Sequence, residues 1–483
     1  MRLKHVRGMR VGRTGNFFAR RRPLYASAVT QSDQQAPHFL VIGGGPAGTA
    51  FATTAAARGA AVTLVEKEIG GGAAHLHDCI PSKTMVASAI RVSVLRDAAK
   101  LGLTIDPAKV DMATLSARIK AITGDINRSR TALLESQGVE IVHGEGSFMD
   151  DHTARVVTED GERVIPFDKA LVATGSVPRV PDWAPVDGER VLTTRDAYDL
   201  PEVPEHLIVI GSGVTGVEFV HIFQSLGAKV TLVVSRQQIL PHRDPEVAAV
   251  LEEDFLDRGV KLLIGARAVG IDLEGDEVVV RCDDGRVARG SHALLAIGSV
   301  PSTANLGLEN AGVETDNGYL VVDEMQRTSV PHIYGAGDCT GQLPLSSVAA
   351  MQGRKIALHA LGVPVTPVDY SKAAQAVFTE PEIASVGLEE VEAAAEGRKV
   401  RTTKVPFAAN ERAVLQGYTR GFVKVISDPA TGVVLGGTIV GHRASELISA
   451  VALAVTARVT VSQLVDTLMV HPSMSEAIAD AAE

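Results

Sequence analysis

The sequence predicts an α/β protein with two three-layer, parallel-sheet domains followed by an α+β domain. Two Gly-x-Gly-x-x-Gly turns, which begin at Gly43 and Gly211, each lie between an apolar stretch typical of a buried strand and a stretch typical of a helix. Residues 420–441 alternate and turn in the way that antiparallel strands do. The 483 residues of the chain are enough for several domains of this kind.

The first of these turns is part of a βαβ unit. An apolar strand is expected over residues 39–42, and the turn and an Ala-rich helix follow it. A second expected strand ends at Glu66, eighteen residues after Gly48, the last glycine of the turn. Glycines at this spacing allow backbone N–H groups and a helix N-terminus to approach a pyrophosphate, and the acid can accept a hydrogen bond from a ribose hydroxyl. The three glycines of the predicted dinucleotide site are Gly43, Gly45 and Gly48.

A Cys-Ile-Pro-Ser-Lys motif follows this unit at residues 79–83. Together, the unit and the motif resemble the pyridine-nucleotide disulfide oxidoreductases, a family that includes lipoamide dehydrogenase, glutathione reductase, mercuric reductase and soluble transhydrogenase. The resemblance extends from about residue 38 to 483, nearly the whole chain. The family pattern has a second cysteine five residues before the cysteine of this motif, where this sequence has Ala74. In this respect the chain is most similar to the lipoamide dehydrogenase-like, one-cysteine NAD(P)H quinone reductases.

The strand–turn–helix–strand pattern recurs between residues 206 and 233. Its glycines are Gly211, Gly213 and Gly216. Two Rossmann-like folds in one chain indicate two dinucleotides, which the resemblance implies to be FAD and either NADPH or NADH. The position that corresponds to Glu66 is Val234, and Ser235 and Arg236 follow it. An acid there would repel a 2′-phosphate, whereas serine and arginine would not, so we expect NADPH to be accepted, alongside NADH or in its place. The alternative for Arg236 is a solvated charge.

The resemblance also implies roles for residues beyond the two turns. Glu218 is expected beneath the nicotinamide, and Lys83 near flavin N5. Asp338, within the sequence PHIYGAGD, is expected to bind the ribityl chain of the flavin. The remaining expected cofactor contacts are Gly175, where the chain crosses to the second nucleotide domain, Gly298, and the backbone of Leu345 and Ser346 beside the isoalloxazine.

Near the C-terminus, His471 precedes a proline and Glu476 follows five residues later. In the family this pair forms a dyad that reaches into the active site of the partner subunit, which implies a homodimer whose sites each need both chains. His471, oriented by Glu476, could protonate a reduced acceptor as a general acid. The alternative is a histidine retained for packing.

The cysteines decide the expected path of the electrons. A disulfide needs two sulfurs whose Cα atoms lie within about 7 Å, and Cys282 and Cys339 belong to other parts of the sequence than Cys79. We therefore expect reduced flavin to pass its electrons directly to a quinone-like acceptor. Cys79 lies at the start of a helix, where the dipole lowers a thiol pKa, and is expected to be a thiolate that tunes the flavin. The expected catalytic residues are Cys79, Lys83, His471 and Glu476.

Two other activities and one non-catalytic role remain open. Soluble transhydrogenase moves hydride between NADPH and NAD⁺ and also needs no disulfide. Dihydrolipoamide dehydrogenase is a further alternative, which Ala74 disfavours. A non-catalytic binding protein is disfavoured by the intact nucleotide motifs in both folds.

Composition excludes several other classes of protein. The net charge of −10 argues against a nucleic-acid surface, and no apolar run is long enough to predict a membrane span. The count of three cysteines fits a reducing compartment, and no metal site is expected. Residues 1–32 contain eight lysines and arginines and no acid. They predict a mitochondrial transit peptide or, in a bacterial gene, a start site placed too early, hence a matrix or a cytoplasmic protein.

Five segments describe the expected domain organisation. A disordered or targeting arm is followed by the first part of the FAD-binding domain, the NAD(P)-binding domain, the second part of the FAD-binding domain and the dimerisation domain. Their limits are 1–35, 36–168, 169–290, 291–363 and 364–483. Within the first part, helices are expected over 84–101 and 112–137, a strand over 139–150 and a hairpin over 154–167.

Overall fold

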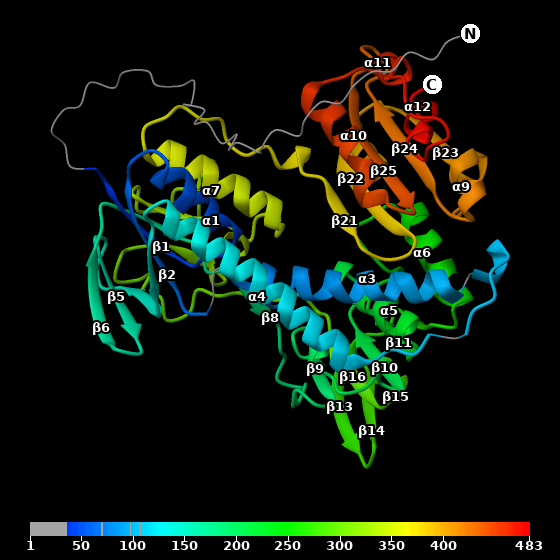
Figure 1. The fold of residues 1–483 in the computed structure, drawn as a ribbon, viewed down its shortest axis with the longest axis horizontal. Helices are drawn as coiled ribbons and strands as arrows, with labels where there is room; N and C mark the ends of the chain where they lie inside the picture. Colours follow the sequence, from blue (N-terminus) through cyan, green and yellow to red (C-terminus); the bar gives the residue numbers. More distant parts are fainter. Residues whose placement is uncertain (1–35, 69–70, 97, 107) are drawn as a thin grey trace, which may run out of the picture. The chain divides into compact units, whose positions relative to one another are not determined.

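Three five-stranded sheets organise the computed structural model, which describes residues 36–68, 71–96, 98–106 and 108–483 (Figure 1). The arm predicted over residues 1–35 lies outside these described residues. In the described part of the chain, no helix is both long enough and apolar enough to cross a membrane.

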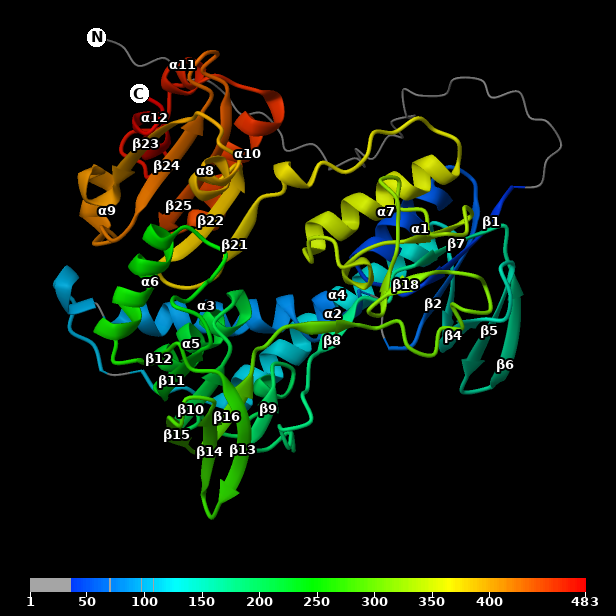
Figure 2. The same cartoon turned by 180° about the vertical axis from the view of Figure 1, so that it is seen from behind.

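The first sheet is parallel and contains the first Gly-rich turn. Its strands, in spatial order, are β20 (Ile333–Gly335), β7 (Lys169–Val172), β1 (His38–Ile42), β2 (Ala61–Glu66) and β3 (Glu140–His143). The helices α1 (Pro46–Ala56) and α7 (Ser346–Ala360) lie side by side in Figures 1 and 2 and share one apolar core with this sheet. The rings of Phe39 in β1 and Phe51 in α1 meet edge to face, with centroids 5.4 Å apart.

The second sheet repeats this arrangement around the second Gly-rich turn. Its strands, in spatial order, are β12 (Lys261–Ile264), β11 (Lys229–Val234), β10 (His206–Ile210), β16 (His292–Leu295) and β9 (Val191–Thr193). As in β1 and β2, the strands β10 and β11 are parallel and are joined by a helix, α5 (Val214–Leu226). The internal repeat predicted from the sequence is therefore confirmed.

Two short strands carry the chain between these sheets. β8 (Ser176–Pro178) follows β7, and β17 (Ser299–Pro301) follows β16, and the two pair antiparallel. Each begins directly after a positive-φ glycine, Gly175 or Gly298, which lies three residues beyond the end of the preceding parallel strand. The predicted limits 168/169 and 290/291 therefore each separate one strand, β7 or β16, from the sheet to which it is hydrogen-bonded. The remaining limits stay predictions.

The C-terminal sheet is antiparallel, in agreement with the alternation of residues 420–441. Its strands, in spatial order, are β21 (Gln375–Val377), β22 (Glu382–Gly387), β25 (Val434–Gly441), β24 (Phe422–Ser427) and β23 (Arg401–Pro406). The helix α10 (Ala444–Ala457) packs on it through Ile448, Val451 and Ala454. Shorter helices complete this region: α8 (Glu390–Ala395), α9 (Glu411–Gln416), α11 (Val461–Val465) and α12 (Glu476–Asp480).

The connecting segments largely follow the predicted elements. The helix expected over 84–101 begins earlier, as α3 (Cys79–Arg96), and the helix over 112–137 is α4 (Met112–Ser136). The strand expected over 139–150 is interrupted at Gly144, where a Cβ would lie 2.3 Å from the carbonyl oxygen of Val157. The predicted hairpin forms part of the sheet β4 (Glu145–Phe148), β5 (Thr153–Thr158) and β6 (Gly161–Pro166).

The other elements are a short helix before the Cys-Ile-Pro-Ser-Lys motif, a helix after the second βαβ unit, and two small antiparallel sheets. They are α2 (Gly72–Leu76), α6 (Pro245–Asp257), the sheet β13 (Ala268–Glu274), β14 (Glu277–Cys282) and β15 (Val287–Gly290), and the pair β18 (Thr315–Asp316) and β19 (Tyr319–Leu320).

Candidate active site

The first Gly-rich turn is shaped to receive a pyrophosphate. A Cβ on Gly43 would lie 2.3 Å from the Ala173 carbonyl oxygen, and one on Gly48 would lie 1.9 Å from the Gly43 carbonyl oxygen, so neither position accepts a side chain. At Gly45 nothing lies within 4 Å of such a Cβ. Gly45 also precedes α1 without a side-chain cap among the described residues, which leaves backbone N–H groups to bind an anion. Glu66 lies at this turn, since its Oε2 accepts from the Gly44 N–H at 2.6 Å.

The second turn has the same geometry. A Cβ on Gly211 would lie 2.3 Å from the Ala296 carbonyl oxygen, one on Gly216 would lie 1.9 Å from the Gly211 carbonyl oxygen, and Gly213 is open. Both turns therefore fit a dinucleotide, the first with an acid for a ribose and the second without one.

The residues that follow β11 are exposed. Val234 is buried, and Ser235 and Arg236 follow it on the surface. Arg243, the next arginine along the chain, already has partners within the protein: its guanidinium donates to Glu389 and to Ser385. Of these two arginines, Arg236 is the one whose guanidinium has no hydrogen bond or ion pair recorded within the described chain.

The Gly-Asp turn at Asp338 joins the first sheet to α7. Ser176, in the crossing strand β8, donates from Oγ to Asp338 Oδ2 at 2.8 Å. The neighbouring Gly337 has φ +77° and donates its N–H to Gln352 of α7 at 2.8 Å. Leu345 is the residue that precedes α7, and Ser346 is its first residue.

Cys79 is the first residue of α3 and is exposed, and its Sγ lies 3.7 Å from Ser346 Oγ. Although the side chain reaches the surface, the protein packed around its other sides desolvates the thiolate and raises the pKa of Cys79; Lys83 and Ser346 oppose this shift. The pKa of Cys79 is therefore raised and not lowered as expected, because burial outweighs the charge of Lys83 and the hydrogen bond with Ser346.

None of the three cysteines is paired. Cys339 is fully buried and donates to the Ala336 carbonyl oxygen at 3.2 Å, and burial raises its pKa to about 11. Cys282 is buried at the end of β14, in the core of the second nucleotide region. Ala74 lies in α2, the helix that precedes the Cys-Ile-Pro-Ser-Lys motif. Both buried thiols thus have the structural surroundings of packed side chains.

Lys83 and Glu218 form a partly buried ion pair between the two nucleotide regions. Lys83 Nζ in α3 lies 2.7 Å from Glu218 Oε2 in α5, and the Glu218 side chain is only 4% exposed. The other carboxylate oxygen accepts from the Phe378 N–H at 2.9 Å, and Lys83 Nζ lies 4.8 Å from the centre of the Phe378 ring. One carboxylate therefore links three segments that are distant in sequence.

Asp78 and Arg195 are two residues near the motif that the sequence did not single out. The Arg195 guanidinium spans both oxygens of Asp78, each at 3.3 Å, and also donates to the Ser176 carbonyl oxygen at 3.1 Å. Burial raises the pKa of Asp78, and Arg195 opposes the shift. The sequence could have indicated Asp78, because it is an acid directly before Cys79. It could not have indicated the pairing with Arg195, which lies 117 residues away.

His471 and Glu476 form the predicted pair. His471 Nδ1 lies 2.9 Å from Glu476 Oε1, and the other carboxylate oxygen accepts from the Ser473 N–H at 2.7 Å. The hydrogen bond with Glu476 raises the pKa of His471, so the imidazole keeps its proton to higher pH than usual. The ring is 66% exposed, and its Nε2 lies 3.4 Å from Glu411.

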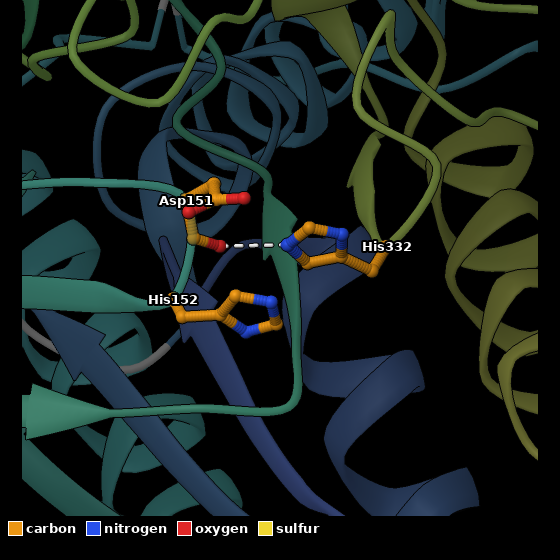
Figure 3. Close-up of side chains that lie close together, drawn as sticks. All are labelled: Asp151, His152 and His332. Atoms are coloured by element: carbon orange, nitrogen blue, oxygen red, sulfur yellow. Dashed lines mark hydrogen bonds between the residues drawn. The ribbon is translucent and has the colours of Figure 1, made fainter.

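A separate group, Asp151, His152 and His332, has the composition of a metal site (Figure 3). Each histidine uses one ring nitrogen to donate to a backbone carbonyl: His332 Nε2 to Asp151 at 2.7 Å, and His152 Nδ1 to Phe167 at 3.0 Å. The two rings stack face to face, with centroids 4.3 Å apart and planes 7° apart. In-plane lone pairs of stacked rings do not converge on one ion, so we assign the group a structural role in holding its turn to the start of β20.

Comparison with known proteins agrees with this geometry. The family model described as pyridine nucleotide-disulphide oxidoreductase matches residues 37–353, and the model of its dimerisation domain matches residues 373–482. An NAD(P)H dehydrogenase (quinone) of Mycobacterium tuberculosis is 45% identical over 457 residues, which cover 92% of this chain and 93% of that protein. A dihydrolipoyl dehydrogenase of Haloferax volcanii is 37% identical and covers 92% and 95%. The crystal structure of LpdA from Mycobacterium tuberculosis has a TM-score of 0.89 and 44% identity and covers 92% and 99%.

Two nucleotide-binding folds joined to a dimerisation domain define a flavoprotein oxidoreductase. The chain belongs to the pyridine nucleotide-disulphide oxidoreductase family, whose members use FAD and NAD(P)H. Two glycine-rich turns of matching geometry are consistent with two such dinucleotides. The matched dimerisation domain indicates a homodimer.

Proposed function

We propose that this enzyme takes hydride from NAD(P)H and passes the electrons through FAD to a quinone-like acceptor, without a redox-active disulfide. The observation that carries the proposal is the surroundings of the Cys79 sulfur. Its side-chain neighbour at hydrogen-bonding distance is the hydroxyl of Ser346, and the position five residues earlier is Ala74. With one thiol at the motif, Cys79 has no second sulfur with which to form a disulfide that the flavin could reduce.

The residues of the chain supply positioning and charge. FAD, when bound, supplies the hydride-accepting and electron-donating chemistry. Glu218 holds the Lys83 ammonium at a fixed place between the two nucleotide regions, where its positive charge would favour negative charge on a bound flavin. His471 is held in one orientation by Glu476 and is available as a proton donor to the reduced acceptor.

Two further observations support this assignment. A relative of 45% identity has the name NAD(P)H dehydrogenase (quinone), although other relatives are named dihydrolipoyl dehydrogenase. The exposure of the His471 ring is consistent with a dyad that completes the site of a partner subunit. Soluble transhydrogenase activity, which also needs no disulfide, is the alternative that acceptor assays separate.

An anaerobic titration tests the path of the electrons. We expect one equivalent of NADPH to bleach the flavin fully, because no dithiol takes up a further electron pair. The matched variant is Ala74→Cys, which restores the spacing of two cysteines in the family pattern and is expected to consume a second equivalent. Uptake of two equivalents by the unchanged protein would contradict the proposal.

Acceptor assays complete this experiment. Menadione is expected to be reduced faster than lipoamide or an NAD⁺ analogue by the unchanged protein. Rapid turnover of dihydrolipoamide would identify a dihydrolipoamide dehydrogenase, and rapid transfer to the NAD⁺ analogue would identify a transhydrogenase.

We further propose that Arg236 allows NADPH to be used. Replacing Arg236 by alanine is expected to raise KM for NADPH by about tenfold to a hundredfold, because an arginine–phosphate hydrogen bond is lost, and to leave KM for NADH unchanged. Arg289→Ala is the control, since this exposed arginine pairs with Glu274 and Glu277 on β13 and β14. Equal effects on both nucleotides, or a hundredfold preference of the unchanged enzyme for NADH, would contradict the assignment.

A further inference from the structure

The N-termini of two helices meet at the Cys79 sulfur. Cys79 is the first residue of α3 and Ser346 is the first residue of α7, 267 residues later in the chain. Both helices are long, so each directs the positive end of its dipole toward this point. The sulfur and the Ser346 oxygen, at 3.7 Å, are within hydrogen-bonding distance for a pair that includes sulfur.

The Ser346 hydroxyl is suited to this thiol. The contact with Cys79 is the one hydrogen bond of its side chain recorded for the described residues. Ser347, the next residue along α7, is exposed and has no such contact recorded there. Lys83 is the cation that acts most strongly on the sulfur, and Asp78 and Glu218 are the two carboxylates that oppose it. Burial and the two carboxylates both disfavour the thiolate form of Cys79. A neutral hydrogen-bond donor at the sulfur favours the thiolate, as Lys83 does.

We infer that Ser346 is a positioning residue, whose hydroxyl holds the Cys79 sulfur at the start of α7 and donates a hydrogen bond to its ionised form. This inference rests on the proposed function, in which Cys79 acts as a single thiol and forms no disulfide. The hydrogen bond fixes the sulfur from a second chain segment, so α3 alone does not determine its place. It also keeps a larger fraction of the thiol ionised at a given pH.

A titration of the thiol in the FAD-loaded dimer tests the inference. The ultraviolet absorbance of the thiolate is followed against pH in the unchanged protein, in Ser346→Ala and in Ser347→Ala, with Cys79→Ser as the optical baseline. In Ser346→Ala we expect the thiolate-to-thiol ratio at a given pH to fall about tenfold, since a donor to a charged group is lost. Ser347→Ala is expected to match the unchanged protein, and Ser346→Thr to keep most of the effect.

The inference would be overturned if Ser346→Ala and Ser347→Ala gave the same thiol titration curve. It would also be overturned if Ser346→Ala, with its full content of FAD, titrated as the unchanged protein does. The measurement does not depend on the electron acceptor. A failure of the quinone assignment therefore shows in the acceptor assays, whereas a failure of the Ser346 role shows in the thiol titration.

Discussion

Replacing Glu218 by alanine is expected to slow reduction of the flavin by NADPH about 100-fold, the size of effect that a misplaced catalytic group produces. The substitution removes the partner that holds Lys83 Nζ at 2.7 Å and leaves the Phe378 N–H without its acceptor. The Lys83 side chain is 31% exposed, so the freed ammonium can turn toward solvent and need not stay at the site. The rate is measured by anaerobic stopped-flow absorbance.

Glu218→Gln is the matched control. The amide keeps the volume of the side chain and an acceptor for the Phe378 N–H but loses the negative charge. We expect it to bind FAD as the unchanged protein does and to show an intermediate rate. A rate in Glu218→Ala within threefold of the unchanged protein would show that the ion pair does not position Lys83 for the reaction.

Replacing Lys424 by methionine is expected to give the largest loss of stability, about 3 kcal/mol or more, because a buried carboxylate then lacks its cation. Lys424 of β24 is 4% exposed, and its Nζ lies 2.7 Å from Asp244, the residue that caps α6. It also lies 3.0 Å from Glu246 and 3.0 Å from Glu390. Urea unfolding of the FAD-loaded protein measures the loss.

The pKa of Lys424 indicates where in pH this stabilisation holds. Burial lowers the pKa, but the hydrogen bonds to Asp244, Glu390 and Glu246 outweigh burial, so the native pKa is raised. The contribution is therefore complete below the ordinary lysine pKa and is lost only as the pH rises through the higher native value.

A neighbouring lysine provides the control for this substitution. Lys404 of β23 is 45% exposed and pairs with Glu246 at 2.9 Å, so Lys404→Met is expected to cost about 0–1 kcal/mol. Adding Asp244→Asn to Lys424→Met should recover part of the loss, because it removes the unpaired charge. Equal losses for the two single variants would show that the burial of Lys424 does not set its contribution.

Residue spacing along the sequence predicted the features that are formed by residues close together in the chain. The glycines of the two turns follow apolar strands at fixed intervals, and the structure places backbone carbonyls where their side chains would be. The acid at Glu66 and its absence at Val234 were equally visible, because both residues end the second strand of a βαβ unit. The His471–Glu476 hydrogen bond joins residues only five positions apart.

Contacts between distant segments could not be predicted in this way. Lys83 and Glu218 are 135 residues apart and Cys79 and Ser346 are 267 apart, so their pairing depends on how α3, α5 and α7 pack. The sequence predicted a lowered pKa for Cys79, and the structure gives a raised one for the same reason. The thiolate is desolvated by neighbours that only the fold brings close to it. The sheet to which β7 and β16 belong is likewise set by pairing with strands distant in sequence, β1 and β20 for β7, and β10 and β9 for β16.

The order of the strands has a consequence for synthesis of the chain on the ribosome. β20 pairs with β7 in the first sheet, although residues 173–332 separate them, whereas the second sheet uses strands that all lie between residues 191 and 295. The nascent chain can therefore close the later sheet first, while the earlier one still exposes the unpaired edge of β7. A chain that ends before residue 335 would leave this edge of β7 open to pairing with other chains.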